Sequence, residues 1–453
     1  MNLPNFFLAD LPPEAILQPS MIREACQCLR RNRRQYLLER STADVIAALD
    51  EVARRWLDPG DRFRRLALDG GPRATGFAPA TLVSGLETFF GQLTAEHLQA
   101  LVRQDLGHLR RLDALSASGD EASARHAALA WGPELLGHVT AGQLPVPALM
   151  SMVLGLLVRS AQFVKCASGA SLIPRLFGHS LYALEPKLAA CLEIAEWRGG
   201  HHELEGALFD EADCLTATGS DEALAAIRQR LPPRVRFLGY GHRVSFGYVT
   251  NAAMTGAQEH RVAARAAADV VAWNQLGCLS PHVIYIERGP QACAEGFAEL
   301  LAGELAKREE TEPRGSVSVE TAAVIASRRA FYEVRAANLR ETRHWFSPAG
   351  THWTVIYEAD PLFQASCLHR FVYVKDVPDL DTALQGAEAV RGRVSTVGLA
   401  ATDEEAAPLA VRLARWGVTR VCPLGRMQSP PLGWRHDGRP SLGDLVTWTD
   451  WEQ

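Results

Sequence analysis

The chain has 453 residues, more than a single hydrophobic core usually supports, so its length predicts two or three domains of about 150 residues each. Hydrophobic residues make up 47% of the chain and charged residues 22%, as in an ordinary globular protein. Lys and Arg total 47 against 52 Asp and Glu, which gives a formal charge of -5 and argues against a nucleic-acid partner.

Neither a membrane span nor a secretion signal is expected. The longest largely apolar stretch, Val146 to Val158, has 13 residues. A membrane helix needs about 20, so this stretch predicts a buried helix. The N-terminal run MNLPNFFLADLPPE has no basic residues before its apolar ones, unlike a signal peptide. The 9 cysteines are scattered and odd in number, which argues against a disulfide framework and predicts a cytoplasmic location.

Apolar residues at helical spacing predict that about the first 110 residues are mainly helical. Ser41 and Thr42 can cap one helix and Thr94 can open another, because their hydroxyl groups accept hydrogen bonds from the first free amides of a helix. The run Asp-Gly-Gly-Pro at 69–72 predicts a turn, and SASGDEAS at 116–123 predicts a hairpin or a linker.

From about Gly132, short apolar runs alternate with helical patterns. The predicted strands are Leu136–Val139, Ala161–Lys165, Cys214–Ala217, Val235–Leu238, Val283–Glu287, Trp353–Tyr357, Phe371–Val374, Val394–Leu399 and Arg420–Pro423. The predicted helices include Ala257–Gln275, Ala292–Arg308, Ser318–Arg340 and Asp403–Trp416. Strands separated by helices predict parallel sheets with helices on both faces, so the expected fold class is α/β, with two α/β lobes and a cleft between them.

Two familiar motifs are incomplete. The run Gly-Tyr-Gly at 239–241 begins like a dinucleotide-binding fingerprint, but Val244 stands at the position of the third glycine. Cys26 and Cys28 have no second cysteine pair and no histidine pair near them, so no metal site is expected.

The run WNQLGCLSPH at 273–282 joins a long Ala-rich helical pattern to an apolar strand pattern. Gly277 and Pro281 mark a tight connection, and Cys278 lies inside it. A cysteine in such a loop can present its sulfur to a cleft, and the backbone N–H groups around it can bind an oxyanion. The alternative is that Cys278 is a small buried hydrophobic residue, as most free cysteines are.

Two other segments have polar residues where a predicted strand ends. Lys165 ends an apolar strand that leads into a helix, and a solvent-facing strand end is the alternative explanation for it. Thr218, Gly219 and Ser220 lie between a strand and an Ala-rich helix. Ser220 is a good helix cap, and plain helix capping is the alternative explanation for this motif. The same exposed amides and positive helix end also suit a pyrophosphate.

In this order, the three segments resemble those of the aldehyde dehydrogenase superfamily. Four runs look most like LuxC-type acyl-CoA reductases: GQLPVPAL at 142–149, GYGHRVSFGYV at 239–249, NQLGCLSPHVIYIE at 274–287 and GRMQSPPLGWRHDG at 425–438. The resemblance extends from about Gly132 to the C-terminus and implies an aldehyde-dehydrogenase-like fold. It implies that Cys278 is the nucleophile, that Lys165 binds the ribose of a nicotinamide cofactor, and that Thr218, Gly219 and Ser220 lie by its phosphates.

Two positions depart from the wider superfamily. Oxidative members have a glutamate that activates water where this chain has Phe237, so a thioester should persist here long enough to be reduced. Those members also have an oxyanion-binding asparagine where this chain has Gln143, whose amide offers the same donor on a longer arm. Gln143 is therefore a candidate oxyanion ligand.

The cofactor preference depends on one position. Three residues beyond the ribose lysine, NAD-preferring relatives often carry a glutamate that repels a 2′-phosphate. Ser168 stands there in this chain, so NADPH is the expected cofactor, with NADH as the alternative.

The resemblance implies reduction of an acyl thioester, carried by CoA or a carrier protein, to the aldehyde by NADPH through an acyl-Cys278 intermediate. His242 and His282 could assist, although ordinary loop histidines are commoner than catalytic ones. The alternatives are a CoA-acylating aldehyde dehydrogenase working in the oxidative direction, a non-redox acyltransferase or thioesterase, and a non-catalytic scaffold.

The expected domains are a helical region plus NAD(P)-binding lobe at 1–250, a catalytic lobe at 251–424, and a tail at 425–453 that packs back on the core. Residues 112–130 are the candidate oligomerisation hairpin. The resemblance also implies a homo-oligomer, and an acyl-donor protein is a candidate partner.

Overall fold

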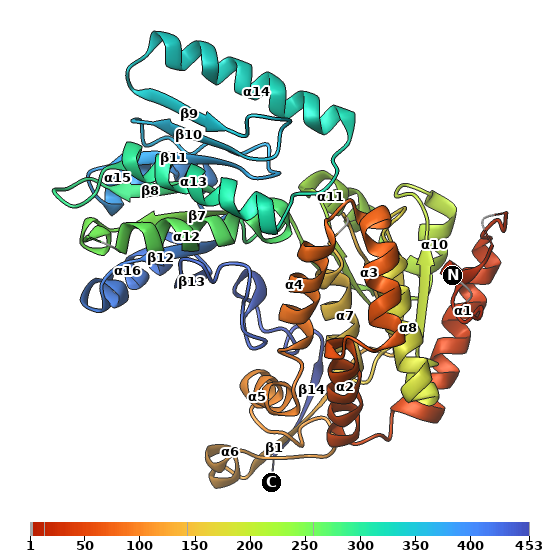
Figure 1. Ribbon diagram of the computed structural model, residues 1–453. Helices are drawn as coiled ribbons and strands as arrows, with labels where there is room; N and C mark the ends of the chain where they lie inside the picture. The colour runs from red at the N-terminus through yellow and green to blue at the C-terminus, as the bar shows by residue number, and fades with distance from the viewer. Residues whose placement is uncertain (1–2, 13, 143, 257, 453) are drawn as a thin grey trace. The chain divides into compact units, whose positions relative to one another are not determined.

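The computed structural model describes residues 3–12, 14–142, 144–256 and 258–452, and Figure 1 labels its elements. Contacts divide the chain into two compact units. Unit 1 is formed from the described residues of 1–75, 86–241 and 431–453, and unit 2 from those of 76–85 and 242–430. The assignment of cofactor binding to one part of the chain and catalysis to the other stays a prediction.

The first 110 residues are mainly helical, as the apolar spacing predicts. The elements are η1 (Leu8–Asp10), α1 (Pro19–Asn32), the π-helical turn η2 (Arg33–Leu37), α2 (Thr42–Leu57), α3 (Arg62–Thr75), α4 (Pro79–Phe90) and α5 (Ala95–Leu106). Two predicted caps are confirmed. Ser41 Oγ accepts a hydrogen bond from Asp44 N at 3.0 Å, and Thr94 Oγ1 accepts one from His97 N at 3.2 Å.

The turn predicted at 69–72 is wrong, because these residues lie inside α3. Gly71 is buried, and its carbonyl accepts a hydrogen bond from Thr75 Oγ1 at 2.8 Å. The helix packs against α8 (Leu172–Leu184). Burial of this helix face outweighs the local turn preference of glycine and proline.

Unit 1 contains a five-stranded sheet of β2 (Leu135–Val139), β3 (Ala161–Cys166), β4 (Leu192–Glu196), β5 (Cys214–Thr218) and β6 (Arg236–Tyr240). Its order is β4-β3-β2-β5-β6 and every neighbouring pair is parallel. The strands are connected through α7 (Val146–Leu157), α8, α9 (Pro186–Ala189), α10 (His202–Glu211) and α11 (Asp221–Arg230). The strand order reverses at β2 and β5, and in doubly wound sheets ligands bind beyond the carboxyl ends of the strands at such a point.

Unit 2 contains a seven-stranded sheet in the order β13-β12-β7-β8-β11-β10-β9. The strands are β7 (Val244–Val249), β8 (Pro281–Glu287), β9 (Thr342–Phe346), β10 (Thr354–Glu358), β11 (Phe371–Val377), β12 (Val394–Ala400) and β13 (Arg420–Pro423). Only β9 among them runs antiparallel to its neighbour. The predicted parallel sheets are therefore confirmed. Sequence reasoning did not identify β4, β7 or β9.

Alternating side chains of the seven-stranded sheet build two cores. Ile284 and Ile286 of β8 pack with α12 (Gln258–Val271) and α13 (Ala294–Thr311). Val283 and Tyr285 of the same strand pack with α14 (Val319–Asn338), α15 (Leu380–Gly386) and α16 (Asp403–Trp416) on the other face. Four shorter 3-10 turns complete this unit and the tail: η3 (Asn251–Met254), η4 (Ala272–Gln275), η5 (Glu388–Val390) and η6 (His436–Gly438). Ala257, the first residue of a predicted helix, lies outside the described residues.

A separate two-stranded sheet joins the middle of the chain to its tail. β1 (His126–Trp131) pairs antiparallel with β14 (Thr447–Glu452), with His126 opposite Glu452. Ser116 and Ala128 of β1 exchange two backbone hydrogen bonds, and the short helix α6 (Gly119–Ser123) lies between them in the chain. In the part of the chain that is described, no helix has both the length and the apolar character needed to cross a bilayer.

Candidate active site

Lys165 lies at the carboxyl end of β3, with a side chain that is 3% exposed. Its Nζ lies 5.8 Å from the centre of the Trp197 ring, and among the described residues none accepts a hydrogen bond from it. Burial lowers the pKa of Lys165, while the carboxylates of Glu205 and Glu196 act in the opposite direction. The Lys165 ammonium group is thus buried and can still donate hydrogen bonds to a ligand. The alternative of a solvent-facing strand end is wrong.

The turn after β3 contains Ser168, which is exposed, and Gly169, whose φ of 78° favours glycine. A carboxylate lies against this turn, because Glu196 at the end of β4 accepts hydrogen bonds from Gly169 N at 2.7 Å and Ser171 N at 3.3 Å. Sequence reasoning missed Glu196. The run Leu-Glu-Ile-Ala at 192–195 is interrupted by an acid, and it was not identified as a strand.

Thr218 ends β5, and Gly219 and Ser220 connect that strand to α11. Ser220 caps the helix, since its Oγ accepts a hydrogen bond from Ala223 N at 3.3 Å. The carbonyl of Tyr240 accepts a hydrogen bond from Gly219 N at 3.2 Å, which ties this turn to the end of β6. Lys165 and Thr218 both lie at carboxyl ends of strands that flank β2, where the strand order reverses.

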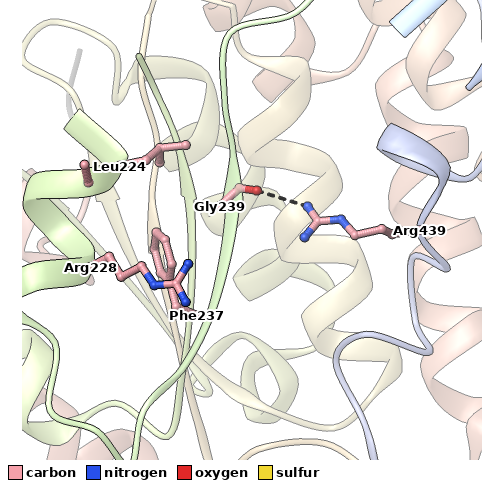
Figure 2. Close-up of a pocket in the computed structure, with 6 residues that line it drawn as sticks. Leu224, Arg228, Phe237, Gly239 and Arg439 are labelled. Atoms are coloured by element: carbon pink, nitrogen blue, oxygen red, sulfur yellow. Dashed lines mark hydrogen bonds between the residues drawn. The ribbon is translucent and has the colours of Figure 1, made fainter. Parts of the chain in front are cut away.

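A shallow cavity of about 390 Å³ lies beside β6 in unit 1, lined by Leu224, Ala225, Arg228, Phe237, Gly239 and Arg439. Figure 2 shows Arg228 reaching toward the Phe237 ring, and Arg439 bonded to the backbone at Gly239. That bond joins Arg439 Nη2 to the Gly239 carbonyl at 3.1 Å. Phe237 thus shares the lining of this cavity with the side chains of Arg228 and Arg439.

Cys278 lies in unit 2, in the turn 277–280 that precedes β8. The turn is closed by a hydrogen bond from Ser280 N to the Gly277 carbonyl at 2.9 Å. Ser245 Oγ donates to the Cys278 carbonyl at 2.7 Å and accepts a hydrogen bond from Thr396 N at 3.1 Å. The residue is half-buried rather than enclosed, so the prediction of a small core residue does not describe it.

The backbone before Cys278 is strained. Trp273, Asn274 and Gln275 have φ of 50°, 53° and 64°, the left-handed region that side chains other than glycine rarely adopt. Asn274 Nδ2 donates to the Arg314 carbonyl at 2.7 Å. Gln275 Nε2 donates to the Phe371 carbonyl at 2.8 Å, and Gln275 Oε1 accepts from Phe371 N at 2.9 Å. Such strain persists where surrounding contacts fix the backbone, and it is found preferentially at functional sites.

His282 is 5% exposed, and its Nδ1 accepts a hydrogen bond from Ser366 N at 3.0 Å. Burial, with a smaller contribution from His242, lowers the pKa of His282 to about 4. His282 is therefore neutral at physiological pH. His242 is exposed. Gln143, the predicted oxyanion ligand, lies outside the described residues.

These groups can support two kinds of chemistry. Unit 1 offers a buried ammonium group and a capped helix N-terminus, which suit hydroxyl and phosphate groups of a nucleotide. Unit 2 offers a half-buried thiol on a turn that accepts a hydrogen bond from Ser245 of the neighbouring strand β7, which suits nucleophilic attack on a carbonyl. Among the described residues, no three His, Cys, Asp or Glu side chains gather closely enough to hold a metal ion.

Sequence comparison finds relatives that are named as long-chain acyl-protein thioester reductases. The long-chain acyl-protein thioester reductase of Aliivibrio fischeri is 23% identical over 370 residues, covering 79% of this chain and 71% of that protein. The long-chain acyl-protein thioester reductase 2 of Photobacterium leiognathi is 22% identical over 324 residues, covering 70% of this chain and 63% of that protein. This chain thus spans less than two thirds of the second relative's length.

Solved structures share the fold at low identity. Bifunctional proline utilization A protein matches with a TM-score of 0.74 at 17% identity, over 99% of this chain and 46% of that one. An NAD-dependent benzaldehyde dehydrogenase from Corynebacterium glutamicum matches with a TM-score of 0.69 at 12% identity, over 98% of this chain and 94% of that one. The predicted aldehyde-dehydrogenase-like α/β fold is confirmed.

The family model of acyl-CoA reductases (LuxC) matches residues 37–448, which include the strand-end lysine, the Thr-Gly-Ser turn and the cysteine turn described above. The protein is therefore an oxidoreductase and a member of the acyl-CoA reductase (LuxC) family.

Proposed function

We propose that this protein reduces an acyl thioester, carried by CoA or by a carrier protein, to the aldehyde with NADPH through an acyl-Cys278 intermediate. The observation that carries this proposal is the half-buried Cys278 on a turn fixed by Ser245, in a chain of the acyl-CoA reductase family. Two relatives bear names that describe acyl-protein thioester reduction, which supports a carrier-bound substrate.

In the first step, Cys278 Sγ attacks the thioester carbonyl. The carbon–sulfur bond to the carrier breaks, and the carrier leaves as a thiolate that takes a proton from solvent. Backbone N–H groups of the Cys278 turn, together with the Gln143 amide, are the proposed donors to the oxyanion, and one such donor typically contributes about 10²–10³-fold in rate.

In the second step, the acyl group on Cys278 is reduced. NADPH held by Lys165 and the Thr218–Ser220 turn would supply the hydride, and with a proton from solvent the thioester carbonyl on Cys278 becomes a hemithioacetal. The carbon–sulfur bond to Cys278 then breaks, releasing aldehyde and returning the thiolate. One NADPH and one proton are consumed for each aldehyde, and the carrier thiol is the other product.

The residues of unit 1 fit a nicotinamide nucleotide. Lys165 has a buried ammonium group that no described residue hydrogen-bonds, so it can donate to ribose hydroxyls. Thr218, Gly219 and Ser220 open α11, and the amides at that helix start suit phosphate oxygens. These residues are the proposed cofactor ligands.

The preference for NADPH over NADH depends on the turn after β3. Ser168 brings no charge to this turn, which supports NADPH. The Glu196 carboxylate lies in the same turn, although two backbone amides partly compensate its charge. Binding of both nucleotides by calorimetry decides the question, and tighter binding of NADH would assign the preference to Glu196.

The experiment that tests the proposed reaction is intact-protein mass spectrometry after mixing with acyl-CoAs of graded chain length. We expect an acyl adduct on Cys278 that is discharged as aldehyde when NADPH is added. Adduct loss as free acid would favour a thioesterase instead, and a faster reaction with aldehyde, CoA and NADP⁺ would favour the oxidative direction. No adduct across the panel would contradict the proposal.

We also propose a homo-oligomer that uses the β1–β14 sheet. Trp131, Trp448 and Trp451 of this sheet are 54%, 40% and 49% exposed, and large aromatic side chains are enriched in protein interfaces. The free cysteines throughout the described chain suit a reducing compartment such as the cytoplasm.

A further inference from the structure

Gln428 belongs to the run GRMQSPP that begins at residue 425, just after β13. Its side chain reaches the turn that contains Cys278. Gln428 Nε2 donates a hydrogen bond to Ser280 Oγ at 2.6 Å. A Cβ on Gly277 would approach Gln428 Oε1 to 3.1 Å, so the amide also lies against the first residue of the turn. One side-chain amide thus contacts both ends of the four-residue turn.

The segment that carries Gln428 is itself fixed. Asp269 of α12 accepts hydrogen bonds from Gly425 N at 2.5 Å and Met427 N at 2.9 Å. Arg420 Nη1 donates to the Met427 carbonyl at 2.7 Å, and the Met427 side chain is fully buried. The backbone that carries Gln428 is therefore held by contacts that do not involve the Cys278 turn.

The turn is held from a second direction as well. Ser245 at the start of β7 donates to the Cys278 carbonyl, while Ser280 is 0% exposed beneath the Gln428 amide. Ser245 holds the Cys278 carbonyl, and Gln428 holds Ser280 at the end of the turn. Rotation of the Cys278 backbone would therefore break at least one of these two hydrogen bonds. This constraint also fixes the direction of the N–H groups in the turn.

We propose that Gln428 is a positioning residue for Cys278: through Ser280 it holds the turn so that the sulfur and the turn amides reach one carbonyl group together. This inference rests on the proposed function. A displacement of about 1 Å at a reacting group can cost about 10²-fold in rate, so losing the amide is expected to slow acylation. Alkylation by a small reagent needs only an accessible thiolate, and it should change little.

The test compares the rate of acylation by an acyl-CoA with the rate of alkylation by iodoacetamide, both read at the Cys278 peptide by mass spectrometry after quenching and digestion, because other cysteines also react with iodoacetamide. Gln428→Ala removes the amide, and Gln428→Glu keeps its size while removing the donor at neutral pH. We expect acylation to fall about 10- to 100-fold in both variants, with kcat reduced and KM for NADPH unchanged. Iodoacetamide alkylation should stay within about twofold of the wild-type rate.

A double-mutant cycle separates positioning from general loosening of the fold. If Gln428 acts through Ser280, then Ser280→Ala should lower acylation to a similar extent, and the double variant should be no slower than either single one. Gln104→Ala is the matched control, because Gln104 Nε2 donates to the Gly433 carbonyl at 2.7 Å and so ties another part of the C-terminal region. This control should acylate at the wild-type rate.

The outcomes are distinguishable. Wild-type acylation rates in both Gln428 variants would overturn the inference and leave the proposed function standing. An equal fall in acylation and alkylation would also overturn it, since that pattern indicates a disordered site. If the wild-type protein formed no adduct at all, the proposed function would fail and the inference with it. Should Gln428→Ala not fold, Gln428→Glu and Ser280→Ala still give the ratio of the two rates.

Discussion

Arg370 and Asn274 are hydrogen-bonded to each other, with Arg370 Nε donating to Asn274 Oδ1 at 3.1 Å, and both have left-handed backbone conformations. Each belongs to a run of three such residues, 273–275 and 368–370. Arg370 is 0% exposed and also pairs with Glu309 at 2.8 Å. The strained backbone before Cys278 is thus supported by a second strained segment and a buried cation.

This support predicts an unusual order of stabilities at position 274. Asn274→Ala removes two side-chain hydrogen bonds and leaves a Cβ at positive φ, so the free energy of unfolding should fall by about 2–4 kcal/mol. Asn274→Gly loses the same bonds but relieves the strain, and it should be about 1 kcal/mol more stable than the alanine variant. Urea unfolding measures both. A glycine variant less stable than the alanine variant would show that strain is not important there.

Replacing the proposed nucleophile should abolish acylation. We expect Cys278→Ser to form no adduct and to lose activity by about 10³-fold or more, because a serine hydroxyl is a far weaker nucleophile without an adjacent base. Cys293→Ser is the matched control, since exposed Cys293 only caps α13 through a contact from Gly296 N, and serine caps helices well. Aldehyde formation by Cys278→Ser at the wild-type rate would remove Cys278 from the mechanism.

Lys165→Met should weaken nucleotide binding and leave the fold intact. Methionine keeps the buried stem but removes the ammonium group, and hydrogen bonds to a charged group contribute about 1.5–3 kcal/mol. The Kd for NADPH, measured by titration calorimetry, should rise about 10- to 100-fold. The control is Lys187→Met on the surface of α9, for which we expect the wild-type Kd. Equal Kd values in both variants would mean that Lys165 does not contact the cofactor.

Phe237→Glu should restore the water-activating carboxylate that oxidative members of the superfamily have. The new carboxylate would share the lining of the cavity with Arg228 and Arg439, and nearby positive charges favour its ionised form. We expect the acyl adduct on Cys278 to be released partly as free acid, with aldehyde yield reduced. Phe237→Gln has the same size without a base and should give aldehyde only. Chromatography of the products separates the two cases, and an absence of acid from the glutamate variant would contradict the assignment of position 237.

The buried His282 predicts a specific dependence of stability on pH. Its pKa is about 4 in the folded protein against the ordinary value of 6.5, so the unfolded chain binds more protons between these two values. The folded protein should therefore lose about 3 kcal/mol from this residue as the pH falls from 6.5 to 4. His282→Gln keeps an acceptor for Ser366 N but does not titrate. Urea unfolding across this pH range should show the difference between the two proteins, and parallel curves would rule out the burial effect.

Much of this fold was predictable because the relevant information is local. Buried parallel strands appear as short continuous apolar runs, and every predicted strand is confirmed with ends within three residues of those observed. Helix caps are equally local, since a hydroxyl group and an amide three residues later suffice to form them, as at Ser41 and Thr94. The incorrect turn at 69–72 shows the limit, because buried contacts of α3 override what glycine and proline favour alone.

The residues of the site divide in the same way. The positions of Cys278, Lys165 and Ser220 follow from strand ends and loops that can be read along the chain. The Glu196 carboxylate beside the Ser168 turn could not be read in that way, because it comes from a neighbouring strand.

The sequence by itself determined the α/β class, the strand and cap positions, and the family resemblance. Only the tertiary structure showed that Cys278 is half-buried, that left-handed backbone precedes it, and that Gln428 contacts the turn in which it lies. The physical reason is distance along the chain. Gln275 and Phe371 are 96 residues apart, and Gln428 and Ser280 are 148 apart, so these contacts form only when the sheet brings its strands together.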